Sequence, residues 1–421
     1  MDQDVTKTVL SNGIKVITKK MPHLRSVSMG VWVHVGGRDE SLAESGVSHF
    51  IEHMIFKGTK KRTAFQIAKE FDAIGGQSNA FTSTENTCYH AKVMDSHMGT
   101  MVDILSDIFL NSVFDEKEVE NERAVILQEI GMAEDSPDEY IHILSGMNFW
   151  GGDSLGRSVL GNRENVNGFD SDGIKRFFHR FYQPDRIVIS AAGNVEHNHF
   201  MDIAGPVFES IRPGESFPER ITPDERCNIN MHYKDLEQVH ICLGTKGMSI
   251  TDPRRYAYSL MNTILGGNMS SRLFQEIREK RGLAYSVYSF VSSFVDTGMF
   301  GAYAGVAPVN IKKSIEVILK EISKIKETRV DSNELRYAKE FIKGNLMLAS
   351  ESNDNQMVRM AQNETHFGRY VPLEEIMNNV ESVTEDDILH LAESLFQNNR
   401  FALTLLGPVD DKHMFDDILP V

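Results

Sequence analysis

The order of predicted strands and helices repeats along the chain, and this repeat constrains the fold more than any other feature of the sequence. In the first half, two alternating strand patterns lie at 14–18 and 26–35, and two helical patterns follow at 47–55 and 65–74. A hairpin pattern comes next, at 77–93. The second half follows a similar course of strand, helix, helix and paired strands, at 238–243, 253–265, 272–280 and 285–304. We therefore expect the second half to be a diverged copy of the first.

The length of the chain also favours two domains. At 421 residues it exceeds what a single hydrophobic core usually supports. The segment 205–226 is rich in Pro, Gly and charged residues, which is typical of a linker. We expect an N-terminal domain at 1–212, a linker at 213–228 and a C-terminal domain at 229–421.

Charge and cysteine content exclude several classes of function. Lys and Arg total 44 against 60 Asp and Glu, and the resulting net charge of -16 disfavours nucleic acid as a partner. The sequence contains no apolar run of the roughly 18 residues that a membrane span needs. The three cysteines are far apart and the N-terminus lacks a signal-peptide pattern, so we expect a cytoplasmic protein without disulfides.

The pattern His49-x-x-Glu52-His53 indicates metal chemistry. On a helix these three side chains fall within an arc of roughly 100°, while apolar neighbours occupy the opposite face. Zinc binds neutral imidazole nitrogens and carboxylate oxygens, and a catalytic zinc site uses three protein ligands and leaves one position open. The two histidines therefore need a third ligand from elsewhere in the chain.

The helical pattern over 116–134 offers two candidates for this ligand. Glu122 and Glu129 both fall at the margin of its apolar stripe. A buried carboxylate is costly unless a cation or hydrogen-bond donors compensate it, and a zinc ion would supply such a cation. The helical projection by itself places both carboxylates on the same edge.

A family resemblance becomes visible at this point. Glu129 lies 76 positions after His53, which resembles the inverted zinc motif of the inverzincins. Two further motifs, Gly75-Gly76-Gln77-Ser78-Asn79-Ala80-Phe81-Thr82-Ser83 and Arg278-Glu279-Lys280-Arg281-Gly282-Leu283-Ala284-Tyr285, extend the resemblance over essentially the whole chain. The chain is similar to the pitrilysin family, in the branch that contains the mitochondrial processing peptidase β subunit and its bacterial relatives.

The resemblance implies an α+β fold of two similar domains. Each domain would be a mixed, mostly antiparallel β-sheet with helices packed on one face. It also implies that His49, His53 and Glu129 bind one zinc ion per chain. Glu52 would be the base that activates the attacking water, and Glu122 would orient a ligand histidine or otherwise support the site.

The same resemblance implies how substrate is held. Asn79, Ala80 and Phe81 would lie on an edge strand to which a peptide adds as an extra strand. Arg278 and Tyr285, from the second half, would close over the metal and donate to the substrate carbonyl and its developing oxyanion. In the mitochondrial enzyme an acidic pair receives a substrate arginine; by spacing those positions are Glu139 and Ile143, so one acid is kept here.

We therefore expect a zinc-dependent endopeptidase that cleaves peptides or unfolded polypeptides in an enclosed chamber. Related proteins carry both halves twice in one chain, so two chains of this length would pair, most simply as a homodimer; a heterodimer with a related subunit is the alternative. The rival function is a catalytically silent or partner-dependent peptide-binding subunit. Such subunits usually lack an intact motif, whereas all four motif residues of the first half are present here.

Overall fold

The computed structural model describes residues 4–214, 217–397, 400–409 and 412–415, and the chain divides into two compact units. The first unit comprises residues 1–131, 157–220 and 347–372. The second unit comprises residues 132–156, 221–346 and 373–421. Each unit therefore contains chain segments from both predicted halves.

The first unit is built on a six-stranded sheet. Its strands follow the order β1-β2-β6-β3-β5-β4. Their bounds are Val5–Val9 for β1, Lys15–Lys20 for β2, Ser26–Val33 for β3, Gln77–Thr82 for β4, Thr87–Met94 for β5 and Ile187–Gly193 for β6. Only β2 and β6 pair in parallel, and β4 forms one edge of the sheet.

Strand alternation gives this sheet two apolar faces. In β3, Val27, Met29, Val31 and Val33 join the main core with the helices, whereas Trp32 belongs to a second cluster on the other face. The helices of the main core are α1 (Val47–Met54), α2 (Ala64–Ala73), α3 (Met98–Asn111), α4 (Glu116–Asp135), α6 (Arg163–Gly168), α7 (Ser171–Phe181) and α8 (His197–Phe208). A sheet with two apolar faces needs a packing partner on each face.

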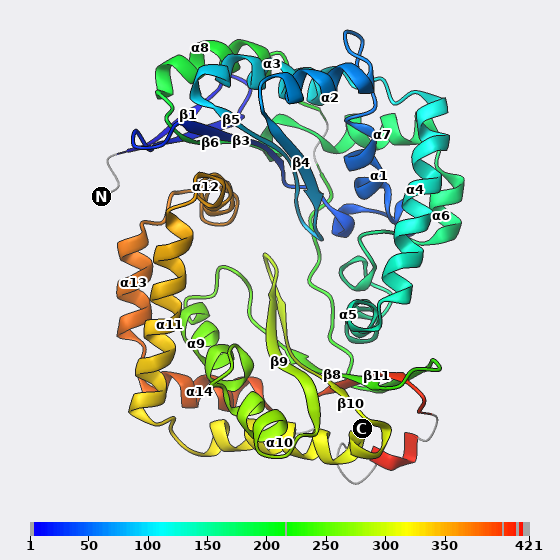
Figure 1. The fold of residues 1–421 in the computed structure, drawn as a ribbon, viewed down its shortest axis with the longest axis vertical. Coiled ribbons are helices and arrows are strands. Elements are labelled where there is room, and N and C mark those ends of the chain that lie inside the picture. The colour runs from blue at the N-terminus through cyan, green and yellow to red at the C-terminus, as the bar shows by residue number, and fades with distance from the viewer. Residues whose placement is uncertain (1–3, 215–216, 398–399, 410–411, 416–421) are drawn as a thin grey trace. The chain divides into compact units, whose positions relative to one another are not determined.

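Helix α12 (Asn353–Phe367) provides the second cover. Its residues Met357, Met360 and Ala361 pack with Trp32 and Val188 on the face opposite the main core. In Figure 1, α12 lies across this sheet from α3 and α8. Although α12 comes from the second half of the sequence, it is part of the first compact unit.

The second unit repeats this arrangement with a five-stranded sheet. The strand order is β7-β11-β8-β10-β9, and only β7 and β11 pair in parallel. The strands are β7 (Ile229–Tyr233), β8 (Val239–Lys246), β9 (Ala284–Ser293), β10 (Gly298–Val306) and β11 (Ala402–Gly407). One face packs on α9 (Arg255–Gly266), α10 (Ile311–Glu327), α11 (Ser332–Ser350), α13 (Leu373–Ser382) and α14 (Glu385–Leu395).

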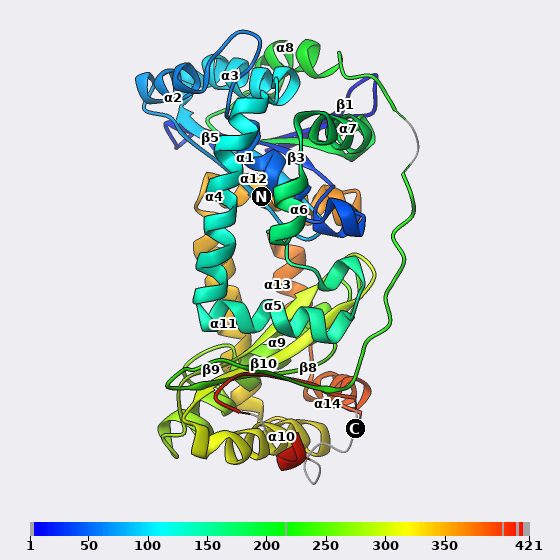
Figure 2. The same cartoon turned by 90° about the vertical axis from the view of Figure 1, so that its right-hand side faces the viewer.

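Helix α5 (Pro137–Trp150) covers the other face of this second sheet. Its residues Ile141, Leu144 and Trp150 pack with Cys242 of β8 and Tyr303 of β10. Figure 2 shows α5 on one side of the sheet and α10 and α14 on the other. The two units thus have equivalent topologies, β2-β6-β3-β5-β4 and β7-β11-β8-β10-β9, and the predicted α+β duplication is confirmed.

Two details go beyond the predicted pattern. Each sheet carries a helix on its second face, in addition to the expected layer of helices on one face. The predicted helix over 272–280 is largely a π-helix, Phe274–Glu279, a wider turn that hydrophobic periodicity does not distinguish from an α-helix. Among the described residues, no helix is both long and apolar enough to cross a membrane.

Candidate metal centre

Helix α1 carries the predicted motif because its apolar residues fix it against the core. Val47, Phe50, Ile51 and Met54 are each 2% exposed or less. The remaining arc carries His49, Glu52 and His53, as the helical period predicts. The core therefore determines which way these three polar side chains point.

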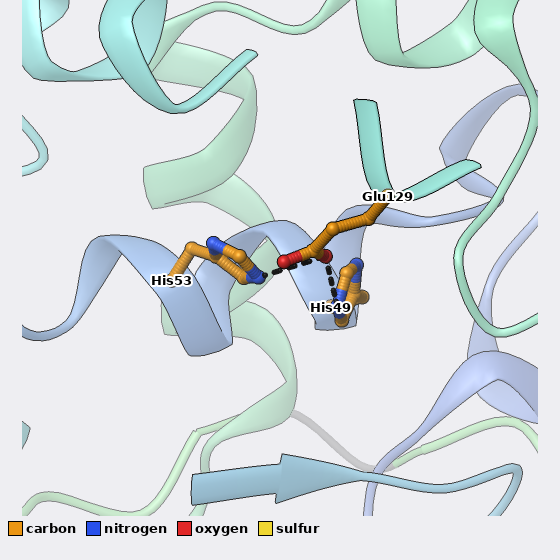
Figure 3. A group of neighbouring side chains, drawn as sticks. All are labelled: His49, His53 and Glu129. Carbon is orange, nitrogen blue, oxygen red and sulfur yellow. Dashed lines mark ion pairs between the residues drawn. The ribbon is translucent and has the colours of Figure 1, made fainter. Parts of the chain in front are cut away.

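Glu129 of α4 approaches both histidines. Its Oε2 lies 3.5 Å from Nε2 of His49 and 3.4 Å from Nε2 of His53. Figure 3 shows the carboxylate of Glu129 between the two imidazole rings. One ligand atom from each residue can be chosen so that all three lie within 4.8 Å of one another.

The two separations that involve Glu129 suit a tetrahedral metal ion. Zinc–nitrogen and zinc–oxygen bonds of about 2.0–2.2 Å at tetrahedral angles place neighbouring ligand atoms about 3.3–3.5 Å apart. The separations of 3.4 and 3.5 Å between Glu129 and the histidines match that spacing. The donor set of two imidazoles and one carboxylate is also the set that catalytic zinc sites use.

The other ring nitrogen of His53 is held by Glu122. Nδ1 of His53 lies 3.0 Å from Oε2 of Glu122, and Oε1 of Glu122 lies 2.5 Å from Nζ of Lys57. A carboxylate accepts hydrogen bonds, so Nδ1 of His53 is the donor and Nε2 keeps its lone pair. The structure thus distinguishes the two carboxylates that the helical projection left equivalent.

His49 is suited to metal binding by its environment. Burial, and next the nearby His53, lower the pKa of His49 to about 4. The imidazole is therefore neutral near pH 7, which is the form that binds a metal. Nδ1 of His49 is buried and has no hydrogen-bond partner among the described residues.

Glu52 lies on the same helix face without joining the ligand cluster. Burial raises the pKa of its carboxyl group; Thr82 and His53 lower it again, while Glu129 adds to the rise. Its Oε2 is buried and without a hydrogen-bond partner in the described part of the chain. A carboxylate with a raised pKa and a free oxygen is well suited to accept a proton near neutral pH.

Strand β4 brings the predicted substrate-binding residues to the edge of the sheet. Asn79, Ala80 and Phe81 pair with His90, Tyr89 and Cys88 of β5 on one side. The other side of β4 pairs with no described strand. Ser83 and Asn86 form a hydrogen-bonded pair, so in this register the backbone N–H of Ala80 faces away from β5. It donates to the side chain of Asn79, 2.8 Å away.

The predicted residues Arg278, Tyr285 and Glu139 belong to the second unit. Arg278 donates to the backbone oxygen of Tyr285 at 2.9 Å, and its guanidinium lies 4.5 Å from the centre of the Tyr285 ring. Tyr285 is 77% exposed, and Glu139 is exposed near the start of α5. Their action on a substrate remains a prediction.

Sequence reasoning missed Lys57, which pairs with Glu122, and Thr82, which lies beside Glu52. Lys57 lies three residues beyond the end of α1, so helical spacing does not place it beside the site. No local pattern in the sequence indicates its contact with Glu122. Thr82 reaches Glu52 through the packing of β4 beside α1, and no local pattern encodes that contact.

Comparison with known proteins places the chain in a family. The profile described as "Insulinase (Peptidase family M16)" matches residues 15–163, and "Peptidase M16 inactive domain" matches residues 168–342. A relative from Bacillus subtilis, named the uncharacterized zinc protease YmxG, is 40% identical over 96% of this chain and 98% of its own length. The chain belongs to peptidase family M16. The predicted family membership is thus confirmed.

Other relatives carry the same kind of name. An uncharacterized zinc protease of Streptomyces coelicolor is 38% identical over 97% of this chain and 90% of its own length. A similar fold is seen in the crystal structure of a protease from Helicobacter pylori, with a TM-score of 0.89 and 22% identity over 96% of this chain and 99% of that one. A Pseudomonas fluorescens structure described as a peptidase M16 inactive domain gives a TM-score of 0.91 at 18% identity, covering 97% and 99%.

Proposed function

We propose that this M16 chain is a zinc-dependent endopeptidase that cleaves peptides or unfolded polypeptides. The observation that carries the proposal is the convergence of His49, His53 and Glu129 beside Glu52. Glu129 lies at distances from both histidines that suit zinc, and Glu52 is half-buried with one buried oxygen. The names of the relatives support zinc as the metal. We assign one zinc ion to each chain.

Each residue of the site has a distinct task in this mechanism. Zinc, when bound, supplies a Lewis acid that polarises a carbonyl group and makes a water molecule more acidic. Glu52 takes a proton from the attacking water and delivers it to the leaving amine. Glu122 holds Nδ1 of His53, so that Nε2 keeps the orientation needed for metal binding.

The free edge of β4 is the proposed binding site for the substrate backbone. An extended peptide that pairs with Asn79, Ala80 and Phe81 would form backbone hydrogen bonds, which depend little on side-chain identity. Arg278 and Tyr285 would act on the scissile carbonyl from the second unit, and Glu139 would favour a basic side chain. We also propose that the substrate is held in an enclosed chamber.

The assembly and location that we propose are a homodimer in the cytoplasm. The location is supported by three cysteines that are all free thiols. Sedimentation at working concentration is expected to give twice the 47.5 kDa mass of one chain. An active monomer would contradict the dimer without affecting the proposed chemistry.

Metal analysis and peptide cleavage together test the proposed function. The purified protein is expected to contain one zinc per chain, to cleave an unfolded polypeptide, to lose activity with a chelator and to regain it with zinc. His53→Ala is expected to lose both zinc and activity. His179→Ala, a change at an exposed histidine of α7, is the matched control and is expected to keep both. A zinc-loaded protein that cleaves no peptide would support the rival reading as a binding subunit.

A further inference from the structure

A buried glutamate that the proposed mechanism does not use stands at the start of helix α1. Glu40 is 4% exposed. Its carboxylate accepts hydrogen bonds from two backbone N–H groups, that of Gly46 at 2.7 Å and that of Ser48 at 2.8 Å. Ser48 directly precedes His49, so one of these bonds is adjacent to a proposed metal ligand.

Helix α1 needs an anchor at this end. The helix has eight residues, and a helix this short is not stable by itself. Gly46 precedes it in a left-handed conformation, φ 100°, and has no side chain that could cap the first turn. The N–H groups at a helix start must find acceptors, and Glu40 supplies two of them.

The segment that carries Glu40 is itself held in place. Arg157 donates to the backbone oxygen of Glu40, and Asn165 donates to the backbone oxygens of Leu42 and Ser45. A side chain on Gly46 would come within 2.8 Å of the backbone of Gly161. Glu40 therefore connects the start of α1 to a fixed part of the first unit.

The two histidines of the site differ in how they are oriented. His53 is held at Nδ1 by Glu122, which is in turn paired with Lys57. Nδ1 of His49 has no such partner among the described residues. The direction of the His49 ring therefore depends on the position of its backbone and on packing, and the backbone position is fixed by the bond from Ser48 to Glu40.

We propose that Glu40 is the positioning residue for His49, in the way that Glu122 is the positioning residue for His53. The proposal rests on the assignment of His49 as a zinc ligand. In this arrangement each histidine of α1 is supported by its own buried carboxylate, one acting on the backbone and one acting on the ring. Loss of Glu40 would shift the first turn of α1 and weaken zinc binding.

The role of Glu40 is geometric. Burial raises the pKa of Glu40 to about 8, although the two backbone N–H groups oppose that rise because they stabilise the ionised carboxylate. The protonated form therefore predominates near pH 7, and the proposal rests on the two hydrogen bonds that the carboxyl oxygens accept, not on charge. A glutamine at this position would turn its amide NH2 group toward one of the two backbone N–H groups. Both groups are donors, so one of the two hydrogen bonds would be lost.

Zinc affinity, measured by competition with a chromophoric chelator, tests the proposal. Glu40→Gln is expected to weaken zinc binding by roughly 10- to 100-fold, the usual effect of removing a partner behind a metal ligand. Glu40→Asp, which keeps the carboxyl group but shortens the side chain, is expected to weaken it as well. The absorption spectrum of the cobalt-substituted protein is expected to change in both variants, because the spectrum reports ligand geometry.

Glu364→Gln is the matched control for loss of a buried carboxylate. Glu364 is 2% exposed, lies in α12 of the same unit and pairs with Lys7 at 2.5 Å. This variant is expected to lower thermal stability while keeping zinc affinity within about twofold of the wild type. If Glu40→Gln does not fold, the zinc affinity of Glu40→Asp provides the test.

The possible outcomes separate this proposal from the proposed function. Wild-type zinc affinity and an unchanged cobalt spectrum in the Glu40 variants would overturn the role of Glu40 and leave the peptidase assignment intact. A wild-type protein that binds no zinc, or a His53→Ala variant that binds zinc normally, would instead overturn the metal site itself. Weakened binding in the Glu40 variants but not in Glu364→Gln would support the proposal.

Discussion

At the scale of single residues, Glu52 separates metal binding from catalysis. It shares a helix face with His49 and His53 but does not join their ligand cluster. Glu52→Gln is therefore expected to retain zinc, because all three ligands remain. Turnover is expected to fall by roughly 10²- to 10⁴-fold, the usual contribution of a general base. Metal content and kcat measured on the same preparation check this, and near-normal kcat would remove Glu52 from the mechanism.

His34 makes a second residue-scale prediction, about acid stability. Nε2 of His34 lies 2.8 Å from the donor Nη1 of Arg220, and Nδ1 lies 2.9 Å from Oδ1 of Asn86, so the neutral ring fits this site. Burial, and next the charge of Arg220, lower the pKa of His34 to about 4. The unfolded chain takes up a proton at His34 near pH 6.5, whereas the folded protein does so only near pH 4. The free energy of unfolding is therefore at its full value above pH 6.5 and decreases as the pH falls toward 4.

His34→Gln tests this effect, since glutamine can accept from Arg220 and donate to Asn86 without titrating. Between pH 7 and pH 4.5 the wild type is expected to lose more free energy of unfolding than His34→Gln. The difference is expected to be up to about 3 kcal/mol, from the size of the pKa change. Urea unfolding of both proteins at both pH values measures it. Parallel losses would show that His34 does not titrate in this range.

The residues of the site were predictable from the sequence to different degrees. His49, Glu52 and His53 follow from helical spacing, because the period of a helix fixes which side chains share a face. For Glu122 and Glu129 the same projection was ambiguous. The structure separates them: Glu122 faces Nδ1 of His53, and Glu129 faces Nε2 of both histidines. Contacts such as Glu40 with the start of α1 depend on tertiary packing, which local patterns do not encode.

At the scale of elements, the edge strand β4 gives a prediction about substrate binding. The N–H of Ala80 is not used by β5. Proline removes this N–H and is tolerated on an edge strand when the lost N–H faces away from the ladder. Ala80→Pro is therefore expected to keep the fold and the zinc. The value of kcat/KM is expected to fall by about tenfold, because one backbone hydrogen bond to the substrate is lost.

Ala80→Ser is the matched control, because it keeps the backbone N–H and nearly the same volume. It is expected to cleave an unfolded polypeptide at close to the wild-type rate. Equal loss of activity in both variants would mean that the side chain at position 80, and not the N–H, is important. Full activity of Ala80→Pro would remove β4 as the binding edge.

Elements with a regular period were predicted well. The hairpin pattern over 77–93 corresponds to β4 and β5, and the pattern over 116–134 corresponds to α4 (Glu116–Asp135). The packing partners of α5 and α12 were not predictable in this way. An apolar stripe shows that a helix face is buried, but it does not show which sheet buries it.

At the scale of the whole molecule, the duplicated halves exchange a helix. Helix α12 comes from the second half and packs on the sheet of the first, and α5 comes from the first half and packs on the sheet of the second. The ranges 1–212 and 229–421 remain a prediction about the repeat in the sequence, and each compact unit contains segments from both. Neither range contains a complete unit.

A fragment of residues 1–212 tests this exchange. Without α12 it would expose Ile17, Trp32 and Val188, which are each 4% exposed or less in the whole chain. Its α5 would lose the sheet that covers Ile141 and Leu144. The exposed apolar area costs about 25 cal/mol per Å², which is enough to remove the small net stability of a domain. The fragment is expected to bind a hydrophobic dye and to unfold without a cooperative transition.

Residues 347–372, fused to this fragment through a flexible linker, are expected to restore cooperative unfolding, because they supply α12. The same fusion with Met357→Asp and Met360→Asp is the control, since both methionines pack on the sheet. It is expected to behave like the fragment without α12. Cooperative unfolding of 1–212 alone, at the temperature of the whole chain, would show that the first half folds independently and that α12 is only an accessory cover.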